Sequence, residues 1–320
     1  MTEAASARNP AEPTPQRFAN PLLRHVAATR PAFLSVTLVG CLLGIASAAA
    51  SGLSIDPLSA VLTVVLALLA HAAGNVINDY HDALSGADML NTRRLFPFTG
   101  GSRFIQNGVL TLRQTGLFAL ALTLAVIPGG LWLAWQAGPG LILIGLAGLL
   151  LGWAYSAPPL KLVSRGLGEV VITLCWLLVV VGADHVQRHG FAWQPVAAGL
   201  SYAMLVANLL YINQFPDHDG DAAAGKRTLV VMLGPETAKW GYFAIAVLAC
   251  IWLILQVERN ALPQGAAAAA LTTVLSFNAA RLLREHASAP QALAPAIHQT
   301  IVAALAHGLI LAGVLYFAHA

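Results

Sequence analysis

Apolar segments of membrane-spanning length recur along almost the whole chain, separated by short polar segments. A transmembrane helix needs about 20 mostly apolar residues. Such runs predict helices, because backbone amides in lipid need partners within their own segment. We therefore expect an all-α membrane protein, a bundle of nine transmembrane helices with boundaries near 32–51, 58–78, 114–135, 139–155, 168–186, 195–214, 236–257, 263–283 and 296–317.

The composition supports a lipid environment. Hydrophobic residues make up 58% of the 320 residues and charged residues only 10%, whereas soluble domains are about 25% charged. The mean hydropathy is +0.71. We expect the lipid bilayer as a partner and no nucleic acid. Cys41, Cys175 and Cys250 lie in apolar runs without metal-ligand spacing, which indicates buried thiols.

The first residues differ from the rest of the chain. Residues 1–29 are rich in Pro, Ala and polar residues and are expected to form a flexible polar tail. Residues 30–320 are expected to form a single polytopic membrane domain. The segment IASAAAS resembles a signal-peptide cleavage site, but the long charged lead-in and the many later spans argue against cleavage.

The charges are strongly asymmetric across the predicted topology. With the amino terminus in the cytoplasm, 15 of the 17 Lys and Arg residues fall on the cytoplasmic side, and only Arg188 and Arg259 fall outside. This is a strong positive-inside bias. Eleven of the 14 acidic residues lie on the same side. We expect a bacterial inner-membrane protein with a cytoplasmic amino terminus and its carboxyl terminus opposite.

Two acidic clusters follow two of the predicted spans. The first contains Asn78, Asp79 and Asp82, with Asp88 downstream, and Asp79 and Asp82 share a helix face if the helix continues. The second contains Asp217, Asp219 and Asp221, and its first and last members also share a face. Each cluster is followed by basic residues: Arg93 and Arg94 after the first, Lys226 and Arg227 after the second.

These residue types favour one kind of ligand. Carboxylates and an Asn oxygen are hard ligands suited to Mg²⁺, which is typically held by one or two carboxylates plus substrate phosphates. Nearby Lys and Arg would neutralise further phosphate charge, and the apolar bundle would accept a hydrocarbon tail. The pattern predicts a lipid diphosphate as substrate. The alternative is that the acids are solvated loop residues, but two spaced clusters at helix ends make it the weaker interpretation.

These motifs resemble those of the UbiA superfamily of intramembrane prenyltransferases. Asn78 and Asp82 match its first motif, Asn-x-x-x-Asp, and Asp217 and Asp221 match its second, Asp-x-x-x-Asp. The run NDYHDALSGAD is similar to the branch that prenylates 1,4-dihydroxy-2-naphthoate in menaquinone synthesis, as are GGSRFIQNGVL, YSAPPLKL and GKRTLVVMLG. Many members carry an acid at the position of Gly86, and the Tyr155-to-Lys161 spacing is longer than in the benzoate-type enzymes.

The resemblance implies a reaction and roles for the site residues. A polyprenyl group would pass from an allylic isoprenyl diphosphate to an aromatic quinone precursor, with Mg²⁺ assisting departure of the diphosphate; with the naphthoate, carbon dioxide is also lost. The implied metal ligands are Asn78, Asp82, Asp217 and Asp221. The implied catalytic residues are Asp79, Asp88 and Asn208, and the implied diphosphate cations are Arg30, Arg93, Arg103, Lys161, Lys226 and Arg227.

Several alternatives remain open from the residues. Asn208 could equally join helices, His71 is more often a packed histidine, and many of the cations could serve only topology. The long loop after the first cluster is expected to cap the site. The runner-up acceptors are of the homogentisate or 4-hydroxybenzoate type. A cation-coupled transporter is disfavoured because transporters bind near the membrane midplane, and a non-catalytic scaffold does not explain paired acid and base clusters.

Overall fold

The computed structural model describes residues 12–318, which form helices joined by turns, with no β-strand in that range. The α-helices are α1 (Pro21–Ala28), α2 (Pro31–Ala50), α3 (Pro57–Ser85), α4 (Ala87–Leu90), α5 (Leu112–Ala137), α6 (Gly140–Ser156), α7 (Gly168–Arg188), α8 (Gln194–Ala223), α9 (Leu229–Leu233), α10 (Pro235–Glu258), α11 (Thr273–His286) and α12 (Ala294–Phe317). Three 3₁₀ segments complete them: η1 (Leu162–Ser164), η2 (Gln264–Thr272) and η3 (Pro290–Ala292).

The number of membrane spans agrees only in part with the sequence prediction. Within residues 12–318, eight helical segments are long and apolar enough to cross a membrane, with η2 and α11 together forming one of them. The expected span at 139–155 forms α6, an apolar helix of 17 residues that falls below this length. The all-helical membrane class is confirmed, and nine spans remain a prediction.

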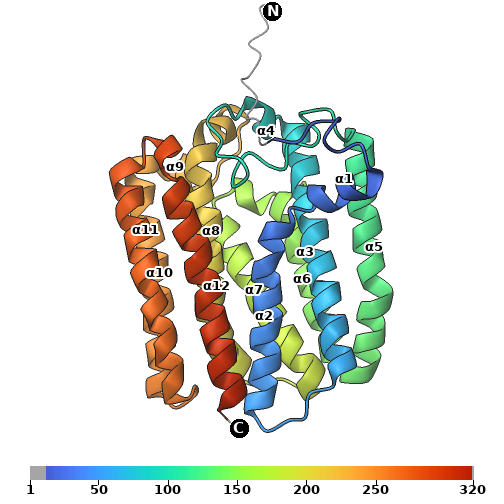
Figure 1. Ribbon diagram of the computed structural model, residues 1–320, viewed down its shortest axis with the longest axis vertical. Helices are drawn as coiled ribbons and strands as arrows, with labels where there is room; N and C mark the ends of the chain where they lie inside the picture. Colours follow the sequence, from blue (N-terminus) through green and yellow to red (C-terminus); the bar gives the residue numbers. More distant parts are fainter. Residues whose placement is uncertain (1–11, 319–320) are drawn as a thin grey trace, which may run out of the picture.

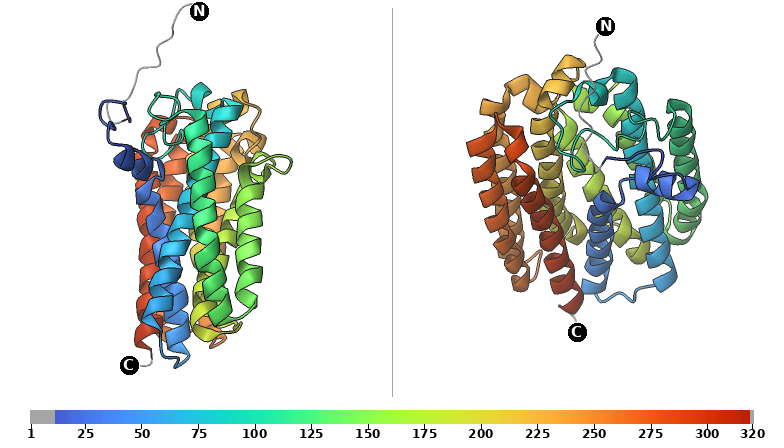
Figure 2. Two further views of the ribbon diagram at one scale, coloured as in Figure 1. Left: turned by 90° about the vertical axis from the view of Figure 1, so that its right-hand side faces the viewer. Right: turned by 45° about the horizontal axis from the view of Figure 1, so that its top comes forward.

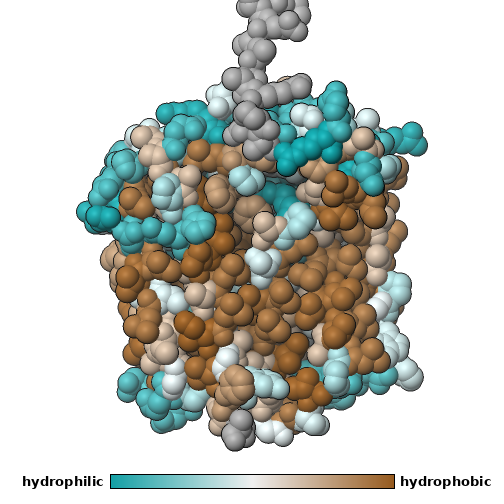
Figure 3. Space-filling model, viewed as in Figure 1, coloured by the Kyte–Doolittle hydropathy of each residue, from teal (hydrophilic) through white to brown (hydrophobic). Residues whose placement is uncertain are grey.

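The outer surface carries a broad apolar belt (Figure 3). Leucines on the perimeter helices α5 and α6 are exposed, including Leu120, Leu131, Leu143 and Leu150. Polar residues gather at the two ends of the bundle in the same view. A continuous apolar surface of this height would aggregate in water, so it indicates an integral membrane protein.

The helices stand side by side in one bundle (Figures 1 and 2). Helix α8 packs against α7, α10 and α12, while α2 packs against α7 and α12, and α3 packs against α5. In α8, 78% of the apolar window is buried inside the protein, compared with 17% in α5. Helix α8 is therefore the central helix of the bundle, and α5 lies on its perimeter.

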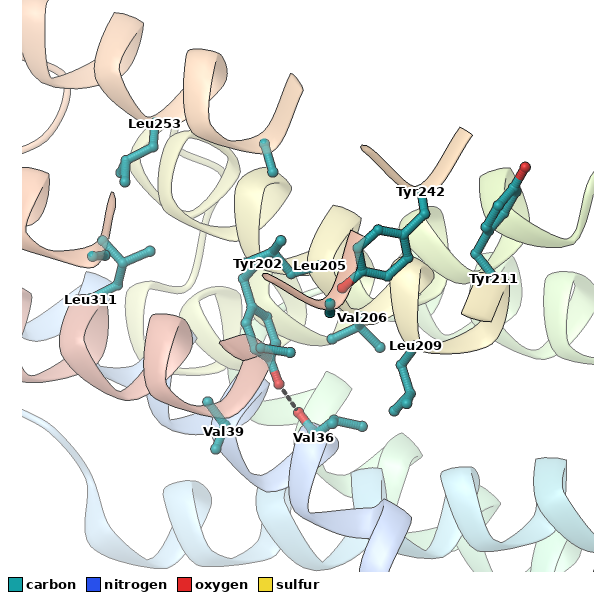
Figure 4. Close-up of a cluster of buried hydrophobic side chains, with 14 of the residues drawn as sticks. Val36, Val39, Tyr202, Leu205, Val206, Leu209, Tyr211, Tyr242, Leu253 and Leu311 are labelled. Atoms are coloured by element: carbon teal, nitrogen blue, oxygen red, sulfur yellow. Dashed lines mark hydrogen bonds between the residues drawn. The ribbon is translucent and has the colours of Figure 1, made fainter. Parts of the chain in front are cut away.

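The central core joins α2, α8, α10 and α12 (Figure 4). The Tyr202 hydroxyl on α8 donates to the Val36 carbonyl on α2. A Cβ at Gly308 of α12 would lie 2.4 Å from a methyl carbon of Val39, so only glycine lets α12 approach this closely. Close backbone approach and interhelical hydrogen bonds hold helices together in lipid, where the hydrophobic effect does not separate helix from tail.

The two helices that carry the acidic clusters run further than the apolar pattern predicts. Helix α3 continues to Ser85 and ends at Gly86, whose φ of +81° is a left-handed conformation that glycine adopts readily. Helix α8 continues to Ala223. The predicted ends at 78 and 214 were too early, because hydropathy reports where apolar residues stop and not where the helix stops. We call the end of the bundle where α3 and α8 finish the motif end.

Part of the predicted tail is described and packs on the motif end. Residues 12–20 lead into α1, which lies across the ends of the bundle helices rather than along them (Figure 2). Asn20 caps α1 by accepting from the Leu22 amide at 2.9 Å. The expectation for residues 1–11 lies outside the described residues.

Candidate active site

The first motif occupies the last two turns of α3. Asn78 donates to Asp82 Oδ2 at 2.9 Å, and the Ser156 hydroxyl at the end of α6 donates to Asn78 Oδ1 at 2.7 Å. Asp79 and Asp82 are buried, with 4% and 8% of their surface exposed. The side-chain oxygen of Asn78 therefore contacts α6, and its NH₂ group holds the Asp82 carboxylate one helical turn further along α3.

The second motif occupies the corresponding turns of α8. Asp221 is buried, and Asp217 is half-buried and accepts from the Asn91 side chain. Asp219, between them in sequence, points elsewhere: it pairs with Arg93 at 2.9 Å, and its side chain is 54% exposed. The i, i+4 pair therefore faces the site and the intervening acid faces solvent.

Lys226 joins the two motifs. Its Nζ lies 3.0 Å from both carboxylate oxygens of Asp82 and 3.6 Å from Asp221 Oδ1. Burial lowers the pKa of Lys226, but the carboxylates of Asp221 and Asp82 outweigh it and raise the pKa well above its usual value. Lys226 is therefore a cation at neutral pH, and the acids of α3 and α8 face a common centre.

The segment 91–111, here called the capping loop, covers the first motif. The Ser102 amide lies 3.3 Å from both carboxylate oxygens of Asp79. Gln106 donates to Asp88 Oδ2 at 3.2 Å. A Cβ at Gly101, where φ is +71°, would lie 2.3 Å from the Asp88 carboxylate, so a side chain there would displace it.

Asp88 is buried on the short helix α4, with 5% of its surface exposed. Burial raises its pKa well above the usual range, and the neighbouring carboxylates of Asp82 and Asp79 raise it further. Several acids thus share one small region with fewer cations, and a ligand that brings positive charge would relieve their repulsion.

The predicted diphosphate cations fall into four groups. Lys226 reaches both motifs, as described above. Arg30, in a left-handed conformation before α2, donates to the Phe98 carbonyl at 3.1 Å and lies over the Phe33 ring at 4.5 Å. Arg103 is buried beside the centre, where it contacts Glu12 and donates to the Asp88 carbonyl. The remaining three lie further out: Arg93 pairs with Asp219, and Lys161 and Arg227 are exposed.

Asn208 is not brought to this centre. It is fully buried within α8, and its amide donates to the Tyr242 carbonyl of α10 at 3.1 Å. Nine residues separate it from Asp217, which corresponds to about two and a half helical turns and places it on the opposite face of α8. The structure gives it an interhelical contact.

Sequence reasoning missed several polar residues that shape the site. Asn91 and Ser102 belong to the capping loop, and Ser156 comes from α6. Asn213 donates to the Phe98 carbonyl at 3.4 Å, while its buried Oδ1 has no hydrogen-bond partner. Its position four residues before Asp217 was the signal available, because that spacing places both on one face of α8.

A cavity of about 250 Å³ opens beside the first motif. Its polar wall includes Arg30 and Ser102, and its apolar wall includes Phe33, Phe98 and Ile301. Ser102 also contacts Asp79, so the cavity adjoins the acidic centre. One end can therefore hold a charged group while the remainder holds hydrocarbon or an aromatic ring.

The carboxylate and amide oxygens of the two motifs suit a hard cation such as Mg²⁺, but they do not surround a metal ion with protein ligands alone. Among residues 12–318, no three acidic, His or Cys side chains converge on a point that could hold a metal ion. Mg²⁺ commonly uses one or two carboxylates and takes its other ligands from phosphates and water. The oxygens of Asn78, Asp82, Asp217 and Asp221 fit that mode of binding.

Residues 37–302 match the model of the UbiA prenyltransferase family, which covers most of the chain. The chain belongs to the UbiA prenyltransferase family. It is therefore a prenyltransferase of the membrane, and the recognition of the family from its two acidic motifs is confirmed.

Named relatives and solved structures agree with this assignment. The chain is 27% identical, over 81% of its length and 85% of the relative, to a Mycobacterium leprae protein named 1,4-dihydroxy-2-naphthoate octaprenyltransferase. It is 29% identical, over 66% of each chain, to a Synechocystis protein named 2-carboxy-1,4-naphthoquinone phytyltransferase. The fold resembles that of a UbiA homolog from Archaeoglobus fulgidus solved with GPP and Mg²⁺, with a TM-score of 0.55, 17% identity, and coverage of 91% of this chain and 100% of that one.

Proposed function

We propose that this protein transfers a polyprenyl group from an allylic isoprenyl diphosphate to an aromatic quinone precursor, 1,4-dihydroxy-2-naphthoate. The observation that carries the proposal is the position of Lys226, within 3.6 Å of both acidic motifs. Acids on two helices around one cation form a charged centre at the end of an apolar bundle, which is the combination that a lipid diphosphate requires.

The diphosphate is the first ligand that this centre would hold. Lys226 and Arg30 supply positive charge from two sides of the acidic region. Asn78, Asp82, Asp217 and Asp221 would hold Mg²⁺, which would supply positive charge to stabilise the leaving diphosphate. The prenyl chain would extend into the apolar part of the bundle.

The acceptor would occupy the cavity beside Asp79. The C1–O bond of the prenyl group breaks and the diphosphate leaves with the electron pair, which leaves an allylic cation. A ring carbon of the acceptor then forms the bond to C1. With the naphthoate, the ring carboxylate leaves as carbon dioxide, which restores aromaticity. Apolar walls such as Phe33 and Phe98 exclude water from the allylic cation. Asp79 and Asp88 are the carboxyl groups placed to accept a proton from the acceptor hydroxyl.

We prefer the naphthoate as acceptor because relatives named 1,4-dihydroxy-2-naphthoate octaprenyltransferase match most of the chain. The Asn-Asp-Tyr-x-Asp run with Asp88 downstream supports the same choice. Homogentisate and 4-hydroxybenzoate are the competing acceptors, and a direct assay separates the three.

We also place the motif end at the cytoplasmic face of a bacterial inner membrane. The support is the excess of Lys and Arg in segments at that end, with Arg188 and Arg259 at the other. Single-cysteine labelling in intact cells tests this: a probe that cannot cross the membrane should label position 259 and not position 93.

The deciding experiment incubates membranes with Mg²⁺, a labelled polyprenyl diphosphate and each of the three acceptors. We expect a prenylated naphthoquinone precursor, abolished by a chelator and by Asp217→Asn. Asp219→Asn is the matched control, because this exposed acid faces Arg93 rather than the centre. If only another acceptor gives product, the proposed acceptor is wrong. If Asp217→Asn still transfers the prenyl group, the proposed site is wrong.

A further inference from the structure

The segment before α1 places a carboxylate inside the protein. Glu12 is 2% exposed. Its Oε1 accepts from Arg94 Nε at 2.7 Å, its Oε2 accepts from Asn107 at 3.1 Å, and Arg103 Nε lies 3.9 Å from Oε2. A carboxylate is costly to bury unless it is paired and hydrogen-bonded, so these contacts make its position specific.

Other contacts extend this attachment along the capping loop. Asn107 also donates to the Pro13 carbonyl at 3.0 Å. The rings of Phe18 and Phe104 lie 5.0 Å apart, and Phe104 belongs to a small buried cluster with Ala28. Residues 12–28 therefore form one wall against which the capping loop is packed.

The same loop contacts the acidic centre on its other side. Ser102 contacts Asp79, Gln106 contacts Asp88, and Arg103 donates to the Asp88 carbonyl. Arg103 itself has a φ of +64°, a conformation that a non-glycine residue holds only when its surroundings fix it. Arg103 thus links Glu12 on one side to Asp88 on the other.

We propose that Glu12 is a positioning residue that fastens the capping loop over the active site. Its carboxylate holds Arg94, Arg103 and Asn107, and these hold Ser102 and Gln106 against Asp79 and Asp88. The effect of this attachment on catalysis rests on the proposed function, whereas the attachment of the loop to Glu12 is independent of it.

The charges around Arg103 indicate where its side chain would move without Glu12. Burial and the like charge of Arg94 lower the pKa of Arg103, against the charges of Asp88, Glu12 and Asp79, which act to raise it. The guanidinium therefore lies within the field of acids on both sides. Without Glu12, it would be drawn towards Asp88 and Asp79 and would compete with Mg²⁺ and the diphosphate for that region.

The test uses the full chain in lipid nanodiscs and the variant Glu12→Gln, with Glu258→Gln as the control because Glu258 is exposed at the opposite end. Hydrogen exchange of residues 99–108 should accelerate by roughly tenfold in Glu12→Gln, the effect of one lost charge-assisted hydrogen bond. Glu12→Asp should restore part of the protection, and the control should match wild type.

Kinetics provide the second readout. Glu12→Gln should raise the KM for the polyprenyl diphosphate and the Mg²⁺ concentration for half-activity by several-fold, with a smaller change in kcat. If wild type has no transferase activity, the proposed function fails, and the exchange result still decides the loop attachment.

Unchanged exchange of residues 99–108 in Glu12→Gln overturns the proposal. If that variant instead loses protection throughout α3 and α8, Asn107→Ala becomes the deciding variant, because it removes the same attachment without removing a charge. Loop-confined acceleration in Asn107→Ala then supports the proposal, and wild-type exchange there overturns it.

Discussion

Two buried polar clusters lie at opposite ends of this bundle, and they differ in charge balance. At the far end, Arg188 donates to both oxygens of Asp184 at 2.7 and 2.8 Å and also to the Ser51 hydroxyl. At the motif end, five carboxyl groups on α3, α4 and α8 lie near three cations, Lys226, Arg30 and Arg103. The first cluster is complete in itself, whereas the second has negative charge left over.

The difference separates a structural cluster from a functional one. A matched bidentate pair ties one turn of α7 to the end of α2 and needs no further partner. Buried acids without matching cations repel one another and destabilise the protein in the absence of ligand. Binding of a cation together with its phosphate ligand removes that repulsion.

The largest effect is expected from Asp82→Asn. The amide keeps the size of the side chain but removes the charge that faces Lys226. Prenyl transfer should fall by roughly a hundredfold or more. The free energy of unfolding should change little, because weaker repulsion among the acids offsets the lost ion pair with Lys226. Product formation and denaturant unfolding measure the two quantities. Near-normal transfer would contradict the functional interpretation of this cluster.

The opposite pattern is expected from Asp184→Asn. The variant leaves the Arg188 guanidinium without its carboxylate in a site where Asp184 is 1% exposed. The free energy of unfolding should fall by about 3 kcal/mol, and transfer per folded molecule should match wild type. A loss of kcat in correctly folded protein would show that the far-end cluster is also part of the catalytic machinery.

A smaller loss of activity is expected from Lys226→Met. Removing the cation between Asp82 and Asp221 weakens diphosphate binding and leaves their repulsion uncompensated. The KM for the polyprenyl diphosphate should rise by roughly tenfold, with Lys239→Met, whose lysine pairs with Glu236, as the control. Equal KM values in the two variants would count against Lys226 as a diphosphate ligand.

Asn208→Ala tests a residue that the structure separates from the site. Its hydrogen bond to the Tyr242 carbonyl joins α8 to α10. The free energy of unfolding should fall by about 1 kcal/mol, and kcat should stay within about twofold of wild type, since a ligand-contacting residue would cost far more. A large fall in kcat with unchanged stability would restore the catalytic role inferred from sequence.

The smallest effect is a pH dependence at Glu12. Hydrogen bonds from Arg94 and Asn107 outweigh burial and lower the pKa of Glu12 below its ordinary value of 4.5. Its stabilising contribution is therefore present above that ordinary value and is lost as the pH falls through the lower, folded-state pKa. The difference in Tm between wild type and Glu12→Gln should be constant from pH 7 to pH 5 and narrow below pH 4.5. A difference that grows in acid would contradict the pairing.

The sequence was sufficient for the features that depend on local periodicity. Apolar runs located the helices, and the i, i+3 and i, i+4 spacing of acids identified the faces of α3 and α8 that meet at Lys226. The same helical geometry would have separated Asn208 from Asp217, because nine residues carry the chain to the opposite face. The catalytic expectation for Asn208 came from its polarity within an apolar run, and it stays a prediction.

Contacts between distant segments were not accessible in the same way. Glu12 lies 82 residues from Arg94, and Asn91 lies 126 residues from Asp217. No period in the sequence connects such pairs, and a polar, proline-rich segment resembles a free tail until its partners are known. The capping loop was expected from its length and glycines, whereas the residues that hold it were not.

The central claim is that both acidic motifs hold one diphosphate together. Calorimetric titration of purified protein with geranyl diphosphate, with and without Mg²⁺, tests it in wild type, Asp82→Asn, Asp221→Asn and the control Asp219→Asn. We expect Mg²⁺-dependent binding in wild type and Asp219→Asn, and loss of binding in Asp82→Asn and Asp221→Asn. Full-affinity binding in either Asp82→Asn or Asp221→Asn would contradict it.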